Sequence, residues 1–289
     1  MPYTDTPLGR TWYESRGRKS SPGVPLICLH GGPGGSSRRM QPLLNLARSK
    51  TTQRRVFIYD QLGGGRSSAS PKSRWTTKTF VRELNTLAKL WELDEFHLFG
   101  ASWGTTLALE FALAHPKKVR SLVFQSPMFS AADWQADADR LIAKLPAKTR
   151  KVIRYCHEIG ATDAQVYQDA MYEYYARHVC RNKTRLQAMF SDSNPNGAKV
   201  YQHMWGPSEF KATGTLREYD QTHRLTELSQ PALVICGEHD EAQPATGRRY
   251  TKQLTTAAFT EIKGASHAIL AEKPKQLLRA IDAFIAQHD

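Results

Sequence analysis

The stretch Gly100-Ala101-Ser102-Trp103-Gly104 decides the fold, because it sets a serine between two glycines where the secondary structure changes. The apolar run before it predicts a buried strand, and the apolar stretch after it predicts a helix. A serine in so tight a strand-to-helix turn projects its hydroxyl above the sheet, and larger residues at either glycine position would clash. The helix N-terminus behind Ser102 also favours developing negative charge. This stretch therefore predicts a nucleophilic serine.

Around this turn, short apolar runs alternate with longer amphipathic stretches. The apolar runs predict strands at 24–30, 55–60, 96–100, 121–125, 232–237 and 258–263. The amphipathic stretches predict helices at 38–48, 79–92, 103–115, 245–254 and 274–288. Such alternation is typical of an α/β fold, with a mostly parallel central sheet flanked by helices on both faces. We assign residues 1–127 and 221–289 to this α/β core.

Residues 128–220 break the alternation. This stretch has amphipathic helical patterns, many aromatic residues and no strand signals. Its loops are rich in Asn, Gly and Pro, which favour turns. We therefore predict a helical cap, or lid, inserted into the α/β core.

Composition narrows the class of protein. With 289 residues, 40% hydrophobic and 23% charged, the chain is typical of a soluble globular protein. No apolar run approaches the length of a membrane span, and residues 1–10 lack the apolar core of a signal peptide. The 4 cysteines make no disulfide scaffold and match no metal motif. We expect a cytoplasmic protein with no metal, no cofactor and no membrane partner.

The formal net charge of +13 raises the possibility of nucleic-acid binding, since the excess is concentrated in residues 1–80. The basic residues there are scattered among strand and loop signals, and no helix-turn-helix or RNA-recognition pattern accompanies them. We interpret the charge as a solvated face and expect no nucleic-acid partner. The oligomeric state stays open.

A second glycine-rich turn, His30-Gly31-Gly32-Pro33-Gly34, follows the first predicted strand. Such a turn exposes backbone N–H groups at the carboxyl edge of the sheet, where ligands bind in α/β folds. We assign the N–H groups of Gly32 and Trp103 to an oxyanion hole, which stabilises the charge that develops during acyl transfer. The alternative is a plain glycine-rich turn.

The ends of the last two predicted strands supply the groups that a nucleophilic serine needs. Asp240 follows one of them and His267 the other, which gives the chain order Ser, Asp, His. His267 would take the proton of Ser102, and Asp240 would orient the imidazole. Rival groups are Asp60, His30, His203 and His239. For His30 and Asp60 we favour hydrogen bonding that supports loops.

Taken together, these motifs resemble the proline iminopeptidase family of α/β-hydrolase serine peptidases, a group that includes L-amino-acid amidases. The matching segments are HGGPG at 30–34, YDQLGGGRS at 59–67, GASWG at 100–104, MWGPSEF at 204–210, GEHDE at 237–241 and GASH at 264–267. They cover nearly the whole chain. The sequence departs from many relatives at Thr105, where they have a further glycine, and at Gly64, where they have cysteine; the first departure puts substrate preference in question.

The resemblance implies that two carboxylates, Glu209 and Glu241, hold the free α-amino group of the substrate. An ammonium that leaves water needs charged acceptors, and each such hydrogen bond contributes about 1.5–3 kcal/mol. The alternative roles are a surface carboxylate of the lid for Glu209 and a helix N-terminal charge for Glu241. Trp205 and Phe129 either line an apolar substrate pocket or belong to the core of the lid.

These residues favour a serine aminopeptidase that cleaves the amide bond after an N-terminal residue with a free amino group, through an acyl-enzyme. The resemblance implies that proline is favoured and that the substrate is a small peptide or an amino-acid amide. The alternatives are an L-amino-acid amidase or carboxylesterase on the same fold, and a non-catalytic binding protein of that fold. A serine at position 102 disfavours haloalkane and epoxide hydrolases, which would carry aspartate there.

Overall fold

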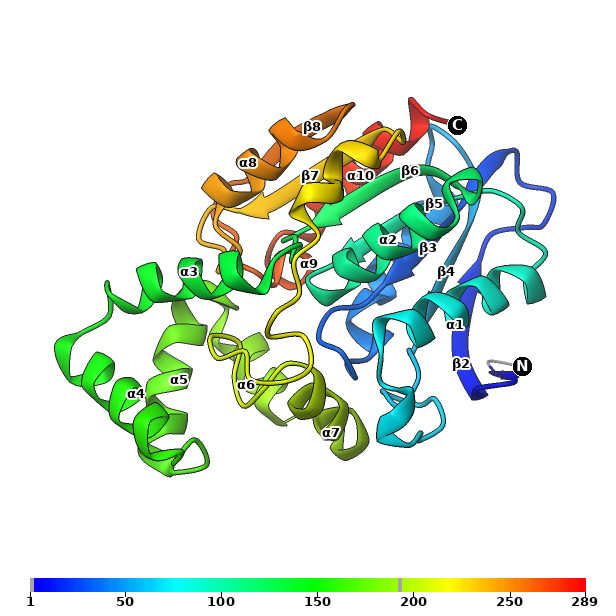
Figure 1. The fold of residues 1–289 in the computed structure, drawn as a ribbon. Helices are drawn as coiled ribbons and strands as arrows, with labels where there is room; N and C mark the ends of the chain where they lie inside the picture. The colour runs from blue at the N-terminus through cyan, green and yellow to red at the C-terminus, as the bar shows by residue number, and fades with distance from the viewer. Residues whose placement is uncertain (1–2, 192–193) are drawn as a thin grey trace.

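A computed structural model describes residues 3–191 and 194–289 (Figure 1). Its centre is an 8-stranded sheet in the order β1-β2-β4-β3-β5-β6-β7-β8. The strands are β1 (Tyr3–Thr6), β2 (Gly9–Arg16), β3 (Gly23–Leu29), β4 (Arg54–Tyr59), β5 (Phe96–Ala101), β6 (Val119–Gln125), β7 (Ala232–Gly237) and β8 (Ala257–Ile262). From β4 to β8 every neighbouring pair is parallel, whereas β1 and β2 are antiparallel. The predicted mostly parallel sheet is therefore confirmed.

The sequence analysis missed the two N-terminal strands. β1 pairs with β2, and β2 pairs with β4, at one end of the sheet. Both strands mix polar, charged and aromatic residues, and most of these residues are partly or fully exposed, so neither strand has the continuous apolar run of a buried strand. The six predicted strands correspond to β3–β8, and their ends agree with the observed ones to within two residues.

Helices cover both faces of the sheet (Figure 1). One face packs against α1 (Thr77–Leu90), α2 (Trp103–Ala114) and α8 (Pro244–Gln253), and the other against η1 (Ser37–Arg48), α9 (Ile269–Glu272) and α10 (Pro274–Ala286). Three short 3₁₀ turns, η2 (Lys72–Arg74), η3 (Pro116–Lys118) and η4 (Thr222–Glu227), join elements. Successive strand residues such as Phe57 and Ile58 enter opposite cores, as the strand repeat requires.

The predicted helix at 38–48 forms as the 3₁₀ helix η1, not as an α-helix. Pro42 lies inside it and lacks a backbone donor, which interrupts a regular α-helical hydrogen-bond ladder. Its buried apolar residues nevertheless pack against the sheet as an amphipathic helix would.

A helical insertion lies between β6 and β7. It contains α3 (Ala131–Ile142), α4 (Ala147–Ile159), α5 (Gln165–His178), α6 (Lys183–Ser191) and α7 (Pro195–Met204), and it projects to one side of the sheet (Figure 1). An antiparallel bridge between Ser130 and Asp220 joins its two ends. Part of the insertion has a hydrophobic cluster of its own, in which Phe210 and Tyr174 are fully buried. None of the described helices is long and apolar enough to cross a membrane.

Candidate active site

Ser102 occupies the turn between β5 and α2 in a strained conformation. Its φ of +54° lies in the region that non-glycine residues rarely adopt. A Cβ atom at Gly100 would collide with the carbonyl of Gly104, and one at Gly104 would collide with the carbonyl of Leu29. Both glycines are therefore required by close backbone approach, and the strain is typical of a functional site.

His267 and Asp240 form a hydrogen-bonded pair. Nδ1 of His267 lies 2.8 Å from Oδ1 of Asp240, in loops that follow β8 and β7. Asp240 is fully buried and also accepts hydrogen bonds from the Ser126 hydroxyl at 2.6 Å, the Gly237 N–H at 3.1 Å and the Ala242 N–H at 3.0 Å. These donors hold the carboxylate in place.

Gln125, at the end of β6, links the serine loop to the histidine loop. Its carbonyl accepts the Ser102 N–H at 2.9 Å, and its side-chain amide donates to the His267 carbonyl at 3.2 Å. Within the described residues, the Ser102 hydroxyl makes no hydrogen bond to His267. Such bonds are often long in free enzymes and form when substrate binds.

The turn at 31–34 lies against the serine. Gly32 has a φ of +56°, and a Cβ atom at Gly31 would lie 3.0 Å from Cβ of Ser102. Trp103 is the first residue of α2, so its N–H has no acceptor within the helix. The Trp103 indole donates to the side-chain oxygen of Gln61 at 2.8 Å, which ties the start of α2 to the neighbouring loop.

The rival groups His30 and Asp60 lie in loop hydrogen bonds. The buried His30 ring accepts the Gln61 N–H at 3.0 Å, and burial lowers the pKa of His30. The Asp60 carboxylate accepts from the Ser37 N–H at 2.7 Å and pairs with Arg66 at 2.7 Å. Both residues therefore hold loops together. His203 packs edge-on against Trp75, and His239 is partly exposed beside Glu238.

A small cavity opens onto Ser102. Its lining combines the serine loop, the glycine turn and the insertion: Gly32, Pro33, Ser102, Trp103, Met128, Trp134, Tyr201, Trp205 and Glu209. Trp205 therefore lines this cavity, which is one of the two positions that the sequence analysis left open for it. Phe129 does not; it is fully buried against Phe124 and Tyr250, and its neighbour Met128 takes its place. Of these two neighbours, Met128 therefore lines the cavity and Phe129 belongs to the hydrophobic core.

The insertion holds Glu209 through aromatic side chains. The Glu209 carbonyl accepts the Trp134 indole at 2.9 Å and the Trp205 indole at 3.2 Å, and its N–H donates to the Tyr175 hydroxyl at 3.3 Å. Burial raises the pKa of Glu209, against the lowering effects of His267 and then of the Tyr201 hydroxyl. A cation bound beside this buried carboxylate would stabilise its charged form.

Glu241 is buried beside the histidine. One of its oxygens lies 3.8 Å from Nε2 of His267, and neither oxygen has a hydrogen-bond partner of normal geometry. Burial raises the pKa of Glu241 well above its usual value; His267 opposes this, and the charge of Glu209 adds to it. A buried, unsatisfied carboxylate is costly, so its presence points to an external donor.

The carboxylates raise the pKa of His267 to about 9, even though burial alone would lower it. Asp240 contributes most to the increase, followed by Glu241, with Glu209 also contributing. The imidazole therefore favours its protonated form while all three carboxylates are charged.

Comparisons with known proteins agree with this architecture. Residues 24–274 match the α/β hydrolase fold family. The chain is 37% identical over 267 residues to a proline iminopeptidase of Heyndrickxia coagulans, covering 91% of each chain. The chain belongs to the proline iminopeptidase family.

Solved structures resemble this member of the proline iminopeptidase family over almost its full length. A proline iminopeptidase from Mycobacterium smegmatis is 31% identical, covers 99% of this chain and 98% of its own, and superposes with a TM-score of 0.88. The structure of VinJ is 29% identical with the same coverage and a TM-score of 0.90.

Sequence reasoning overlooked several residues of the site in this proline iminopeptidase family member. Gln125 ends β6 and contacts His267, and Ser126 follows it and contacts Asp240, but a Gln-Ser pair at a strand end matched no motif. Ser126 also has a φ of +53°. Its position at the carboxyl end of a parallel strand was the signal that could have identified it. Trp134 and Tyr201 were recognisable as aromatic residues only, because their contacts depend on tertiary structure.

Proposed function

We propose that this chain is a serine aminopeptidase that hydrolyses the amide bond after an N-terminal residue with a free amino group, with proline favoured. The observation that carries this proposal is the pair of carboxylates beside the serine and histidine. Glu209 lines the same cavity as Ser102, and the unpartnered Glu241 lies 3.8 Å from His267. An esterase or carbon–carbon hydrolase has no use for two such carboxylates.

In the proposed reaction, His267 takes the proton of the Ser102 hydroxyl while the oxygen attacks the carbonyl of the first residue. The Gly32 and Trp103 N–H groups receive the developing oxyanion. His267 then protonates the leaving amine, and water hydrolyses the ester of Ser102 by the same route. Asp240 holds the imidazole through its 2.8 Å contact to Nδ1.

Glu209 and Glu241 would bind the substrate ammonium and thereby set its distance from Ser102. An aminopeptidase needs this distance to be fixed, because only the first carbonyl should reach the serine. The cavity walls between these groups are apolar and aromatic, with Met128, Trp134 and Trp205 among them. A compact apolar ring such as proline suits such walls, and the names of the relatives support that preference.

The substrate ammonium would also change the protonation of His267. In the free enzyme burial lowers the pKa of His267, but the three carboxylates, when charged, raise it to about 9, and the imidazolium form has no free lone pair to accept the serine proton. An ammonium between Glu209 and Glu241 offsets their charge, so the pKa of His267 falls and the neutral base forms. The base would then be available mainly when a substrate with a free amine is bound.

We further propose that residues 128–220 act as a lid over the core formed by 1–127 and 221–289. One amine anchor, Glu209, comes from the insertion, and the other, Glu241, comes from the loop after β7. Ammonium binding would therefore draw the two parts together. Water exclusion would strengthen each charge–charge contact in the closed site.

A substrate panel tests this function. One sample of the enzyme is labelled with a fluorophosphonate, and a separate, unlabelled sample is assayed on proline p-nitroanilide, N-acetylproline p-nitroanilide, prolinamide and p-nitrophenyl acetate. We expect labelling that Ser102→Ala abolishes, fast turnover of the two free amines and very slow turnover of the acetylated anilide. Equal specificity constants for the free and acetylated anilides would overturn the aminopeptidase proposal in favour of an esterase-like enzyme.

A further inference from the structure

Met128 forms one wall of the active-site cavity, and it is fastened to the helix that follows the nucleophile. The Thr105 hydroxyl accepts the Met128 N–H at 2.9 Å and donates to the Ser102 carbonyl at 2.6 Å. The Thr106 hydroxyl donates to the Met128 carbonyl at 2.6 Å. Two successive residues of α2 therefore hold the backbone of Met128 at its N–H and at its carbonyl.

These hydrogen bonds are shielded from water. Thr105 and Thr106 are fully buried, and Met128 is buried as well. A hydroxyl has one hydrogen to donate, and Thr105 uses it on Ser102 while a lone pair receives the Met128 N–H. Loss of this hydroxyl would leave a buried N–H without its acceptor, which is costly unless the backbone moves.

The segment 125–128 is bonded to the nucleophile turn near both of its ends. Gln125 is the last residue of β6, and its carbonyl accepts the Ser102 N–H at 2.9 Å. Met128 comes three residues later and is bonded through Thr105 to the Ser102 carbonyl. The position of the Met128 wall relative to the nucleophile is therefore set by the Thr105 hydroxyl.

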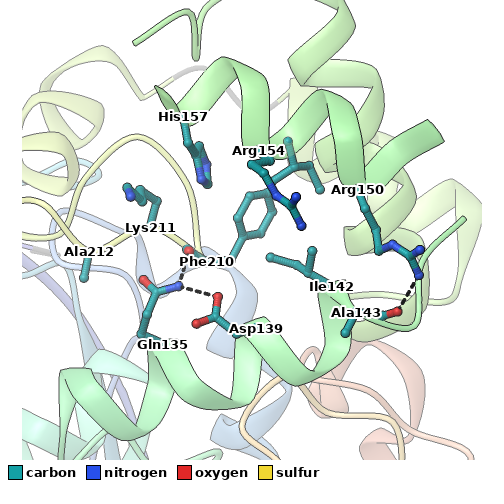
Figure 2. Close-up of a pocket in the computed structure, with 11 residues that line it drawn as sticks. Gln135, Asp139, Ile142, Ala143, Arg150, Arg154, His157, Phe210, Lys211 and Ala212 are labelled. Atoms are coloured by element: carbon teal, nitrogen blue, oxygen red, sulfur yellow. Dashed lines mark hydrogen bonds between the residues drawn. The ribbon is translucent and has the colours of Figure 1, made fainter. Parts of the chain in front are cut away.

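The wall contributed by the insertion is held by contacts that do not involve α2. Trp134 and Glu209 line the cavity, and the Trp134 indole donates to the Glu209 carbonyl at 2.9 Å. Behind them, in the hollow between α3 and α4, the Gln135 amide donates to the Phe210 carbonyl at 2.8 Å (Figure 2). A substitution in α2 should therefore displace one wall of the cavity and leave this one in place.

We propose that Thr105 is a positioning residue that limits the size of the first substrate residue, because it fixes Met128 against the cavity. This role rests on the proposed acyl transfer to Ser102, which places the first residue in the cavity that Ser102 and Met128 share. It is independent of amine recognition by Glu209 and Glu241. In an apolar pocket one methylene changes selectivity about 10- to 200-fold, so a small shift of one wall has a measurable effect.

Thr105→Ala and Thr105→Ser form a matched pair, because the two variants differ only in the hydroxyl. Each is assayed on alanine p-nitroanilide and leucine p-nitroanilide, and on the p-nitrophenyl esters of propionate and 4-methylpentanoate. These two acids are alanine and leucine without the amino group. The ester pair therefore compares the same two side chains in the absence of an amine.

We expect the wild type to favour the smaller member of each pair. In Thr105→Ala the kcat/KM ratio of alanine to leucine anilide should fall at least about fivefold, because the released Met128 makes room, and the ester ratio should fall too. Thr105→Ser should retain both wild-type ratios. The control is Thr86→Ala, which removes a hydroxyl that donates to the Arg82 carbonyl at 2.9 Å on α1 and should change neither ratio.

Thermal unfolding and circular dichroism check that the variants fold. If Thr105→Ala fails to fold, Thr106→Ala releases the Met128 carbonyl instead and should lower the ratios in the same direction. Wild-type ratios near one, unchanged ratios in the folded alanine variant, an equal loss on every substrate, or the same change in Thr105→Ser would overturn this role. A wild type that cleaves the esters but neither anilide would refute the aminopeptidase function, while the ester ratio still tests Thr105.

Discussion

The carboxyl edge of the sheet and the helical insertion contribute to the site in different ways. Ser102, Asp240 and His267 lie on loops that leave parallel strands, so the hydrogen-bonded sheet fixes where each one emerges. Glu209 lies in an irregular segment of the insertion, held by the indoles of Trp134 and Trp205. In the proposed mechanism the chemistry is thus placed on a rigid scaffold, whereas recognition of the amine would depend on side-chain packing in the insertion.

The largest expected effect comes from substitutions in the loops at the carboxyl ends of the strands. Ser102→Ala and His267→Ala should each lower kcat by about 10⁴–10⁶-fold on every substrate, because the nucleophile or its base is lost. Turnover of proline p-nitroanilide is the measurement, with thermal unfolding as the control for folding. A folded Ser102→Ala protein with normal activity would refute the assigned nucleophile.

The next largest effect should appear on amine substrates and not on a neutral ester. Glu241→Gln and Glu209→Gln keep the side-chain shape, remove the charge and present an amide donor to the ammonium. Each should lower kcat/KM on proline p-nitroanilide by about 10- to 100-fold, equivalent to one charge-assisted hydrogen bond. On p-nitrophenyl acetate we expect little change at a pH where His267 is neutral.

The matched control for these variants is Glu158→Gln, which removes an exposed carboxylate from α4 of the insertion. It should leave both substrates unaffected. If Glu209→Gln and Glu241→Gln slow the neutral ester as strongly as the anilide, then these residues stabilise the structure and do not select amines.

The pH dependence should also differ between the substrates. Because the pKa of His267 is raised to about 9, the neutral base is lost as the pH falls through that value. For the neutral ester, kcat/KM should therefore increase with pH and level off above pH 9, with the midpoint of the increase near 9. With a bound ammonium the pKa of His267 falls, so kcat for proline p-nitroanilide should reach its plateau at lower pH.

Glu241→Gln sharpens this test, because it removes one charge that raises the pKa of His267. The midpoint for the neutral ester should move to lower pH in this variant, and it should stay unchanged in Glu158→Gln. Coincident pH profiles for the ester in wild type and Glu241→Gln would contradict electrostatic coupling between the two residues.

The smallest effect concerns the support of Glu209. Tyr175→Phe removes the hydroxyl that accepts the Glu209 N–H at 3.3 Å, a long hydrogen bond that contributes about 0.5 kcal/mol. We expect KM for proline p-nitroanilide to rise about two- to threefold with kcat nearly unchanged. The neutral ester serves as the reference, and an equal loss on both substrates would indicate a general disturbance of the insertion.

Sequence patterns located the sheet because its signals are local. Buried parallel strands need continuous apolar runs, so the sequence predicts β3–β8. The turn at Ser102 needs glycines on both sides, so the sequence also predicts the position of the serine. The N-terminal strands β1 and β2 could not be predicted in this way, since partly exposed strands have mixed composition. That Met128 and not Phe129 lines the cavity depends on tertiary packing, because Phe129 is fully buried in the core.

The sequence by itself determined the fold class, the family and the order in which the serine, aspartate and histidine occur. Only the tertiary structure decided that Glu241 is buried without a partner 3.8 Å from His267, and that Glu209 meets Ser102 in one cavity. It also placed the Ser126 hydroxyl against the carboxylate of Asp240. The reason is that desolvation and charge coupling depend on distances between segments far apart in the chain, which no local pattern records.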